Sequence, residues 1–327
     1  MAEILSLAVD NLISPIILSF VLGLSAAFLR SELSFPEAVA RGLSIYLLFA
    51  IGFKGGAGVA EHGIDLGLVA TLAAATLLSF GLPFVAYALL GALTRFNTVE
   101  KAAVAAHYGS ISIVTFVAAT SVLEGRGLAY EGYMVAAAAA MEAPAIMSAL
   151  WIIARSGSGG TPAAGLYREV LLNGSIVLLV GSFLIGMITG EAGMETVAAF
   201  IVSPFQGVLC LFLLDMGLVA GRSLRDNPAV LGAGGILFGL LMPLLGSAFG
   251  LLAAQLVGLS LGGTALLMTL AASASYIAVP AAMRVALPEA RPSVYLTLSL
   301  GVTFPFNLAV GIPIYTAAAT MIAGGQS

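Results

Sequence analysis

The amino-acid sequence predicts an all-α integral membrane protein that crosses the bilayer ten times. Of its 327 residues, 60% are hydrophobic and 9% are charged, and the mean hydropathy is +1.10. Soluble domains are instead about half apolar and one-quarter charged. Much of the chain falls into apolar runs of about 20 residues, the length that a helix needs to cross a bilayer core about 30 Å thick. A soluble enzyme and a disordered chain are therefore excluded.

Charged residues, prolines and glycine clusters mark the ends of the predicted helices. The ten helices are expected at residues 12–30, 36–60, 65–94, 98–123, 130–155, 167–189, 195–222, 228–256, 261–286 and 292–323. The stretch from Asn227 to Met283 carries no charge and is too long for one crossing, so a turn is expected near Gly258–Gly263. A linker rich in Gly and Ser, residues 156–166, separates an N-terminal half, 1–155, from a C-terminal half, 167–327.

The basic residues predict the orientation of the helices. Most of them lie in or beside the connections that follow the odd-numbered helices: Arg30, Arg41, Arg95, Lys101, Arg155, Arg168, Arg222, Arg225, Arg284 and Arg291. Because Lys and Arg are retained on the cytoplasmic side, these connections are expected to be cytoplasmic and both termini extracytoplasmic. Five helices on each side of the linker make the second half an inverted repeat of the first, as in many secondary transporters.

Small, hydroxyl-rich motifs recur at matching places in the two halves. Helix 98–123 contains Gly109-Ser110-Ile111-Ser112, and helix 261–286 contains Ser273-Ala274-Ser275. Both helices are expected to break there, so that half-helix N-termini face an anion while the preceding carbonyls suit a cation. The alternative is that these small residues only permit close helix packing. The predicted substrate-binding residues are Tyr108, Gly109, Ser110, Ile111, Ser112, Ser273, Ala274, Ser275 and Tyr276, with the two tyrosines as lids.

Charged residues within the apolar runs are further candidates for function. They are Lys54, Glu142 and Asp215. An ionised side chain at mid-helix costs about 2.5–3.5 kcal/mol, so such residues normally face a cavity or a partner. Glu142 lies beside the helix-breaking Pro144, and Asn307 is its uncharged counterpart in the second half. A Na⁺ or H⁺ site is therefore predicted near Ser110, Glu142 and Asn307.

The other two charges have structural alternatives. Glycines surround Lys54, and Glu61 and Asp65 follow it, so an ion pair is as plausible as a coupling role. Asp215 lies two turns from Arg222, and a partner on another helix is expected for it.

Other classes of protein are disfavoured. His107 stands three residues before Ser110, but nucleophilic catalysis also needs an oxyanion hole and a group that orients the base. His107 is instead expected to form a hydrogen bond within its own helix or to line the pathway, and no enzymatic activity is predicted. Twelve basic against sixteen acidic residues exclude nucleic-acid binding. No cofactor is expected besides a coupling ion.

Six stretches, in order along nearly the whole chain, resemble motifs of the sodium-dependent bicarbonate transporter family, the SbtA-like permeases. They are Ser14-Pro15-Ile16 with Gly23, residues 51–56, residues 107–110 with Ser112, residues 141–145, residues 271–275, and Leu287-Pro288 followed by residues 292–295. The resemblance implies a core domain that moves against a gate domain, and a trimer in the cell inner membrane. It also implies that bicarbonate binds between the two broken helices with Na⁺ close by. In cyanobacterial members a PII-like protein regulates transport from the cytoplasmic face.

The chain departs from the cyanobacterial members and resembles a different branch of the family. Tyr276 stands where those members have an acidic residue, and their counterpart of Lys54 is uncharged. We hypothesise that Lys54 supplies permanently the positive charge that Na⁺ supplies elsewhere, which would make transport independent of Na⁺. The linker is also shorter than the cytoplasmic insert of those members, which argues against the regulator.

The sequence therefore predicts a secondary active transporter that imports bicarbonate by elevator-like alternating access, coupled to Na⁺. One alternative is a carrier of another small anion or carboxylate that is independent of Na⁺ or coupled to H⁺. An alternative from a different class is an anion channel.

Overall fold

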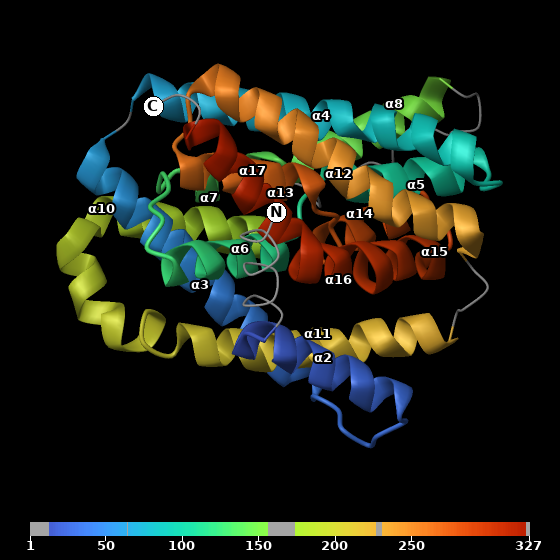
Figure 1. The fold of residues 1–327 in the computed structure, drawn as a ribbon, viewed down its shortest axis with the longest axis horizontal. Helices are drawn as coiled ribbons and strands as arrows, with labels where there is room; N and C mark the ends of the chain where they lie inside the picture. The colour runs from blue at the N-terminus through green and yellow to red at the C-terminus, as the bar shows by residue number, and fades with distance from the viewer. Residues whose placement is uncertain (1–12, 64, 156–173, 227–230, 325–327) are drawn as a thin grey trace.

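The computed structural model is helical, and it describes residues 13–63, 65–155, 174–226 and 231–324 (Figure 1). Those residues contain no β-strand. The whole predicted linker, residues 156–166, and Arg168 lie outside the described residues. The all-α class is therefore confirmed for the part of the chain that is described.

The helices of the first half are α2 (Pro15–Phe28), α3 (Glu37–His62), α4 (Leu66–Leu93), α5 (Thr98–Gly109), α6 (Ile113–Gly125), α7 (Met134–Ala140) and α8 (Glu142–Arg155). Those of the second half are α10 (Gly174–Ile201), α11 (Phe205–Asp226), α12 (Gly232–Val257), α13 (Leu261–Ala272), α14 (Ala278–Ala286), α15 (Pro292–Leu296), α16 (Phe304–Phe306) and α17 (Ile312–Gly324), with π-helical turns η1 (Thr297–Thr303) and η2 (Asn307–Gly311).

Eight helical segments in the described residues are long and apolar enough to cross a membrane. They are Glu37–Glu61, Leu66–Leu93, Thr98–Gly125, Met134–Arg155, Ile176–Ile201, Phe205–Asp226, Gly232–Val257 and Pro292–Ile322. Two shorter apolar helices, α2 and α13, lie where the remaining two crossings were expected. A protein that crosses the membrane several times follows, whereas the count of ten crossings stays a prediction.

Of two neighbouring predicted helix boundaries, one differs in the structure. The sequence ends a helix at residue 189, and the backbone leaves the helical conformation at Gly190, where φ is 58° and ψ is −149°. Glycine tolerates this conformation. A second helical piece within α10 then continues to Ile201, so the next helix begins at Phe205 and not at residue 195. The turn before α11 lies instead around Pro204.

The helices form two groups. In the first group α3 packs along α10 and α2 packs along α11, and we call these four helices the four-helix layer (Figure 1). The second group comprises α4 to α8 and α12 to α17, in which α4 packs on α5, α8 and α12, and α13 packs on α12 and α17. We call it the broken-helix unit, because both interrupted helices belong to it. Contacts between the two groups are less extensive than those within each group.

Glycines allow close backbone contact within the four-helix layer, and these contacts come in matched pairs. Gly23 of α2 lies against the backbone of Leu214 in α11, and Gly186 of α10 lies against the backbone of Phe53 in α3. The two glycines are 163 positions apart, and their partners are 161 positions apart. The contact between α2 and α11 is thus repeated between α10 and α3.

A second pair of glycines repeats the same relation from the opposite helices. Gly217 lies against the backbone of Phe20, and Gly56 lies against the backbone of Phe183. The spacings are again 161 positions between the glycines and 163 between their partners. All four contacts therefore follow the same offsets between the two halves of the chain, 163 positions from α2 to α10 and 161 positions from α3 to α11.

The glycine at position 217 should not tolerate a methyl group. A Cβ atom there would lie 2.8 Å from the Leu24 nitrogen and closer still to the Phe20 carbonyl oxygen, whereas a Cβ at Gly207 of the same helix would meet no atom within 4 Å. We expect Gly217→Ala to lower the free energy of unfolding by about 1–3 kcal/mol. Thermal unfolding of the purified protein in detergent measures this effect. Gly207→Ala is the matched control and should be neutral or stabilising, and equal midpoints for the two variants would contradict the close packing.

Candidate functional site

Two helices of the broken-helix unit are interrupted where the sequence predicts. The first interruption separates α5 from α6 at residues 110–112, where Ser110 and Ser112 have extended backbone conformations. Ser112 caps α6, and its side chain accepts a hydrogen bond from the Thr115 nitrogen at 3.2 Å. The second interruption separates α13 from α14 at residues 273–277. Serine favours both breaks because its hydroxyl replaces a backbone partner at a helix end.

The two breaks meet each other. The Ser275 nitrogen donates a hydrogen bond to the His107 carbonyl oxygen at 2.7 Å, and the Ser112 nitrogen donates to the Ser273 hydroxyl at 2.9 Å. The serine side chains at positions 110, 112, 273 and 275 are all at most 3% exposed. The two serine motifs, separated by more than 150 residues, therefore form one buried site, as their matching positions predict.

These contacts bring the N-terminal ends of α6 and α14 beside the C-terminal ends of α13 and α5. The first N–H groups of a helix have no acceptor within the helix, and the helix dipole makes that end positive. None of the ion pairs found among the described residues involves a residue of either break. The electrostatic character of the site thus comes from backbone donors and hydroxyl groups, a combination that suits a small anion.

Three buried polar atoms of this region lack a hydrogen-bond partner in the described structure. They are His107 Nε2 in the last turn of α5, Thr115 Oγ1 in the first turn of α6, and the Tyr276 hydroxyl in the second break. His107 Nδ1 bonds to the Ala103 carbonyl oxygen at 2.7 Å, as predicted for a bond within its own helix. Buried polar atoms normally have partners, so each of these three atoms is a position at which a ligand or a water molecule could bind.

The predicted cation site lies beside the breaks. The Ser110 hydroxyl donates to Glu142 Oε2 at 2.6 Å, and Glu142 is only 7% exposed. None of the basic residues in the described ranges forms an ion pair with this carboxylate. A buried, unpaired carboxylate is costly unless it binds a cation or a proton.

Asn307 occupies the corresponding position at the second break. Its Nδ2 donates to the carbonyl oxygen of Ala272, the last residue of α13, at 2.9 Å, and its Oδ1 accepts from the Tyr315 hydroxyl at 2.8 Å. Asn307 begins the π-helical turn η2, and Glu142 begins α8 after the interruption at Met141. Glu142 of α8 thus lies beside the end of α5, and Asn307 of η2 lies beside the end of α13.

Lys54 pairs with a residue that the sequence does not suggest. Its Nζ lies 3.1 Å and 3.4 Å from the two carboxylate oxygens of Glu124, not beside Glu61 or Asp65, which were the expected partners. The Tyr130 hydroxyl donates to the same carboxylate at 3.0 Å. Glu124 lies at the end of α6, which packs on α3. Lys54 therefore pairs with a residue that is close in space and not with one that is close in sequence. The three residues border a cavity of about 180 Å³.

Asp215 also differs from its expected arrangement. It is 7% exposed within α11, and none of the ion pairs found in the described residues reaches it from another helix. The positive charge that acts on it is Arg222 of its own helix. The expected partner on another helix is therefore absent from the described structure.

The two tyrosines predicted as lids have different surroundings. The Tyr108 hydroxyl bonds to Thr303 Oγ1 at 2.6 Å, and its ring packs on Phe238 with centroids 4.8 Å apart, so this side chain is held between helices and does not serve as a lid. Tyr276 is half-buried, packs on Phe304 and lies near the Ser112 hydroxyl. Only Tyr276 remains a candidate to cover the site.

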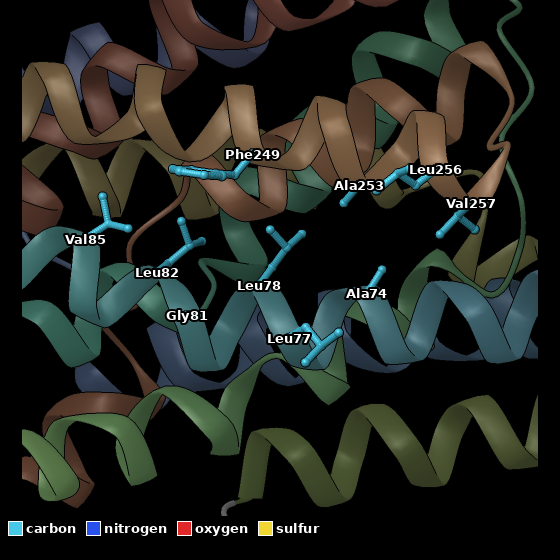
Figure 2. Close-up of a pocket in the computed structure, with 10 residues that line it drawn as sticks. All are labelled: Ala74, Leu77, Leu78, Gly81, Leu82, Val85, Phe249, Ala253, Leu256 and Val257. Carbon is cyan, nitrogen blue, oxygen red and sulfur yellow. The ribbon is translucent and has the colours of Figure 1, made fainter.

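Other features of the structure do not suit an anion. A hollow of about 330 Å³ between α4 and α12 is lined only by apolar residues (Figure 2): Ala74, Leu77, Leu78, Gly81, Leu82, Val85, Phe249, Ala253, Leu256 and Val257. The Gly-x-Ser-x-Gly stretch at Gly258–Gly262 resembles a hydrolase motif, but Ser260 caps α13 and donates to Glu131 at 3.0 Å. Ser260 is therefore a structural serine.

Two residues near these sites were not predicted from the sequence. Thr115 lies three residues after the capping Ser112, which is the helix position at which a hydroxyl can turn back toward the break. Glu124 ends an apolar run and looks like an ordinary helix-terminal carboxylate. The spacing after Ser112 offered a signal for Thr115, whereas no local pattern identifies Glu124 as the partner of Lys54.

Comparison with known proteins assigns a family to this arrangement. A family model described as the Na⁺-dependent bicarbonate transporter superfamily matches residues 15–320 of the 327 residues. The matched range includes both breaks and the residues that approach them. No curated protein matches the chain.

The contact between the breaks can be tested at Ser273. Its hydroxyl accepts from the Ser112 nitrogen and donates to the Leu270 carbonyl oxygen. We expect Ser273→Ala to cost about 1–3 kcal/mol, because the buried Ser112 N–H group loses its acceptor. Thr269→Val is the matched control, because the Thr269 hydroxyl bonds only to the Ala265 carbonyl oxygen of the same helix. Thermal unfolding should show a lower midpoint for Ser273→Ala alone. An unchanged midpoint would argue against the hydrogen bond between the two breaks.

Proposed function

Because the chain belongs to the Na⁺-dependent bicarbonate transporter superfamily, we propose that it imports bicarbonate across the inner membrane by secondary active transport coupled to Na⁺. The observation that carries this proposal is the buried meeting of the two breaks, which joins two positive helix ends and leaves polar atoms without partners. The family supplies the substrate class, and the site supplies groups that fit it.

Bicarbonate is a small planar anion with two acceptor oxygens and one hydroxyl donor. The N-termini of α6 and α14 supply N–H donors for its oxygens, and the Tyr276 hydroxyl supplies another. His107 carries its proton on Nδ1 if that atom donates to Ala103, which leaves Nε2 as an acceptor for a hydroxyl group. The unpartnered atoms therefore include both the donors and the acceptor that bicarbonate needs.

The coupling cation is assigned to Glu142. A carboxylate, the Ser110 hydroxyl and the carbonyl groups freed at the end of α5 are oxygen ligands of the kind that Na⁺ binds. A Na⁺ ion at this position would neutralise the buried charge next to the anion. Binding of the anion and of the cation would then favour each other.

Coupling to H⁺ is the second candidate, and one specific observation favours it. The Ser110 hydroxyl supplies the only hydrogen bond found for Glu142 within the described residues. Protonation would neutralise this carboxylate as well as Na⁺ would. Transport of another small carboxylate would use the same site, because helix N-termini bind carboxylates.

The transport movement is proposed to follow from an inverted repeat. The matched glycine contacts pair α2 with α10 and α3 with α11, with a register of 163 and 161 positions. The broken-helix unit has nearly the same register, because Gly109 lies against Pro83 while Gly246 lies against Ala271, with 162 positions between Gly109 and Ala271 and 163 between Pro83 and Gly246. In this proposal the four-helix layer is the gate, and the broken-helix unit is the core that moves against it as an elevator.

The repeat also relates the two charges of the four-helix layer. Lys54 and Asp215 are 161 positions apart, the spacing that relates α3 to α11, so they occupy equivalent positions of opposite sign. Lys54 has its counter-ion in Glu124 of the core, which argues against its use as the charge that balances bicarbonate. We propose instead that the Lys54–Glu124 pair holds the core against the gate in one of the transport states.

The proposed coupling is tested with labelled bicarbonate in proteoliposomes. We expect saturable uptake that an inward Na⁺ gradient accelerates. In Glu142→Gln the amide oxygen still accepts from Ser110 but carries no charge, so the stimulation by Na⁺ should fall about tenfold or more. Glu100→Gln is the control, because Glu100 is similarly buried, at 6% exposure, but is paired with Arg291.

The outcomes separate the candidates. Uptake that ignores Na⁺ but follows a proton gradient would replace Na⁺ by H⁺ as the coupling ion. Uptake of acetate or pyruvate without any of bicarbonate would overturn the substrate. Flux without saturation or coupling would indicate a channel.

The Lys54–Glu124 pair is tested by charge reversal. We expect Lys54→Glu and Glu124→Lys each to reduce the uptake rate, and the double variant to recover it, with an interaction energy of at least about 0.5 kcal/mol. Lys101, which lies over the Tyr87 ring with no ion pair among the described contacts, provides the control. Glu124→Lys should not rescue Lys101→Glu. Strictly additive effects of the two reversals would show that the pair does not contribute to transport.

A further inference from the structure

A second polar hollow lies at the end of the four-helix layer, where α2 and α11 terminate side by side (Figure 1). Its volume is about 500 Å³, and it is lined by Ala27, Arg30, Ser31, Arg222, Arg225 and Asp226. Three arginines against one aspartate give it a net positive charge. It contains no residue of the two breaks, and the distribution of basic residues predicts that it faces the cytoplasm.

Two of the arginines are held in place by backbone carbonyl groups. Arg222 donates to the Leu33 carbonyl oxygen at 2.8 Å, and Arg225 donates to the Ala27 carbonyl oxygen at 2.7 Å and to Asp226 at 3.0 Å. Both side chains are half-buried. Because a guanidinium group has five N–H donors, these bonds fix its orientation and leave donors for another acceptor. The hollow is thus a preformed cationic site.

The third arginine is held in an unfavourable backbone conformation. Arg30 has φ of 58°, and it is the only non-glycine residue in the described ranges with a positive φ. It follows the end of α2, where the Ser31 nitrogen bonds to the Ala26 carbonyl oxygen, a position at which glycine is the usual residue. An arginine there costs conformational energy that glycine would not. This cost suggests that the Arg30 side chain has a role in the hollow.

Apolar side chains at the membrane surface adjoin this cationic site. Phe28 and Leu29, which immediately precede Arg30, are 50% and 82% exposed. In a membrane protein such side chains at the end of a helix contact lipid hydrocarbon. A charged hollow next to them fits a molecule that has an anionic head and an apolar tail.

We propose that this hollow binds the phosphate group of an anionic phospholipid, with the acyl chains against the end of α2. Arginine is suited to this task because its planar guanidinium group forms paired hydrogen bonds with phosphate oxygens. Basic pockets on the cytoplasmic side of membrane proteins bind lipid headgroups in this manner. The lipid would bridge α2 and α11, so it would stabilise the four-helix layer without entering the transport site.

The test uses the purified full chain in detergent with added phosphatidylglycerol, phosphatidylcholine or inorganic phosphate. Native mass spectrometry measures bound lipid, and thermal unfolding measures stabilisation. We expect phosphatidylglycerol to bind and to raise the unfolding midpoint, and the other two additives to have little effect. Arg30→Gly should weaken phosphatidylglycerol binding about fivefold, while its midpoint without lipid stays equal to or above that of the unaltered protein, because glycine suits the backbone.

Two further variants complete the experiment. Arg222→Gln should weaken phosphatidylglycerol binding in the same manner as Arg30→Gly. Arg41→Gln is the control, because it removes the same charge from the same predicted face, at a residue that is paired with Glu37 outside the hollow. Binding of phosphatidylglycerol to Arg41→Gln should be unchanged.

Three results would overturn the proposal. Equal binding of phosphatidylcholine would show that the arginines do not select the lipid. Equal stabilisation by inorganic phosphate would assign the hollow to a soluble anion. An equal loss of binding in Arg41→Gln and Arg30→Gly would show that binding depends on the general surface charge and not on the hollow.

Discussion

The structure depends on how the chain satisfies backbone polar groups that are exposed when a helix breaks inside a membrane. An unsatisfied N–H or C=O group costs several kcal/mol in hydrocarbon. Here each break supplies part of the partners for the other, since the Ser275 N–H group bonds to the His107 carbonyl oxygen and Ser112 bonds to Ser273. The two halves of the chain must therefore fold together for the breaks to be satisfied.

The interrupted helices α7–α8 and η1–η2 each place one polar side chain beside a break. Asn307 satisfies the backbone carbonyl group of Ala272 at the end of α13, whereas Glu142 accepts a hydrogen bond from the Ser110 hydroxyl. Asn307 is a neutral amide with a partner for its nitrogen and for its oxygen, whereas Glu142 brings a charge. The site is thus similar in geometry in the two halves and different in electrostatics.

Much of this arrangement could be predicted from the sequence, because it is encoded locally. Serines and glycine interrupt an apolar helix at positions 109–112 and 273–275, and a proline lies two residues from each polar residue of the interrupted helices, after Glu142 and before Asn307, so the breaks and their neighbours are visible as patterns. Contacts between distant segments are not encoded in this way. The partner of Lys54 lies 70 positions away, and the surroundings of Tyr108 depend on Thr303, 195 positions away. The start of α11 was misplaced because a second helical piece extends from the bend at Gly190 to Ile201.

The single buried carboxylate at the first break bears on the driving force. If Glu142 stays ionised in the empty protein and one Na⁺ accompanies each bicarbonate, the empty and the loaded binding site carry the same net charge of minus one. A transport cycle then moves no net charge, so the membrane voltage contributes no energy to accumulation. The bicarbonate concentration ratio would be limited by the Na⁺ concentration ratio alone, and steeper accumulation would need a second cation site elsewhere in the chain.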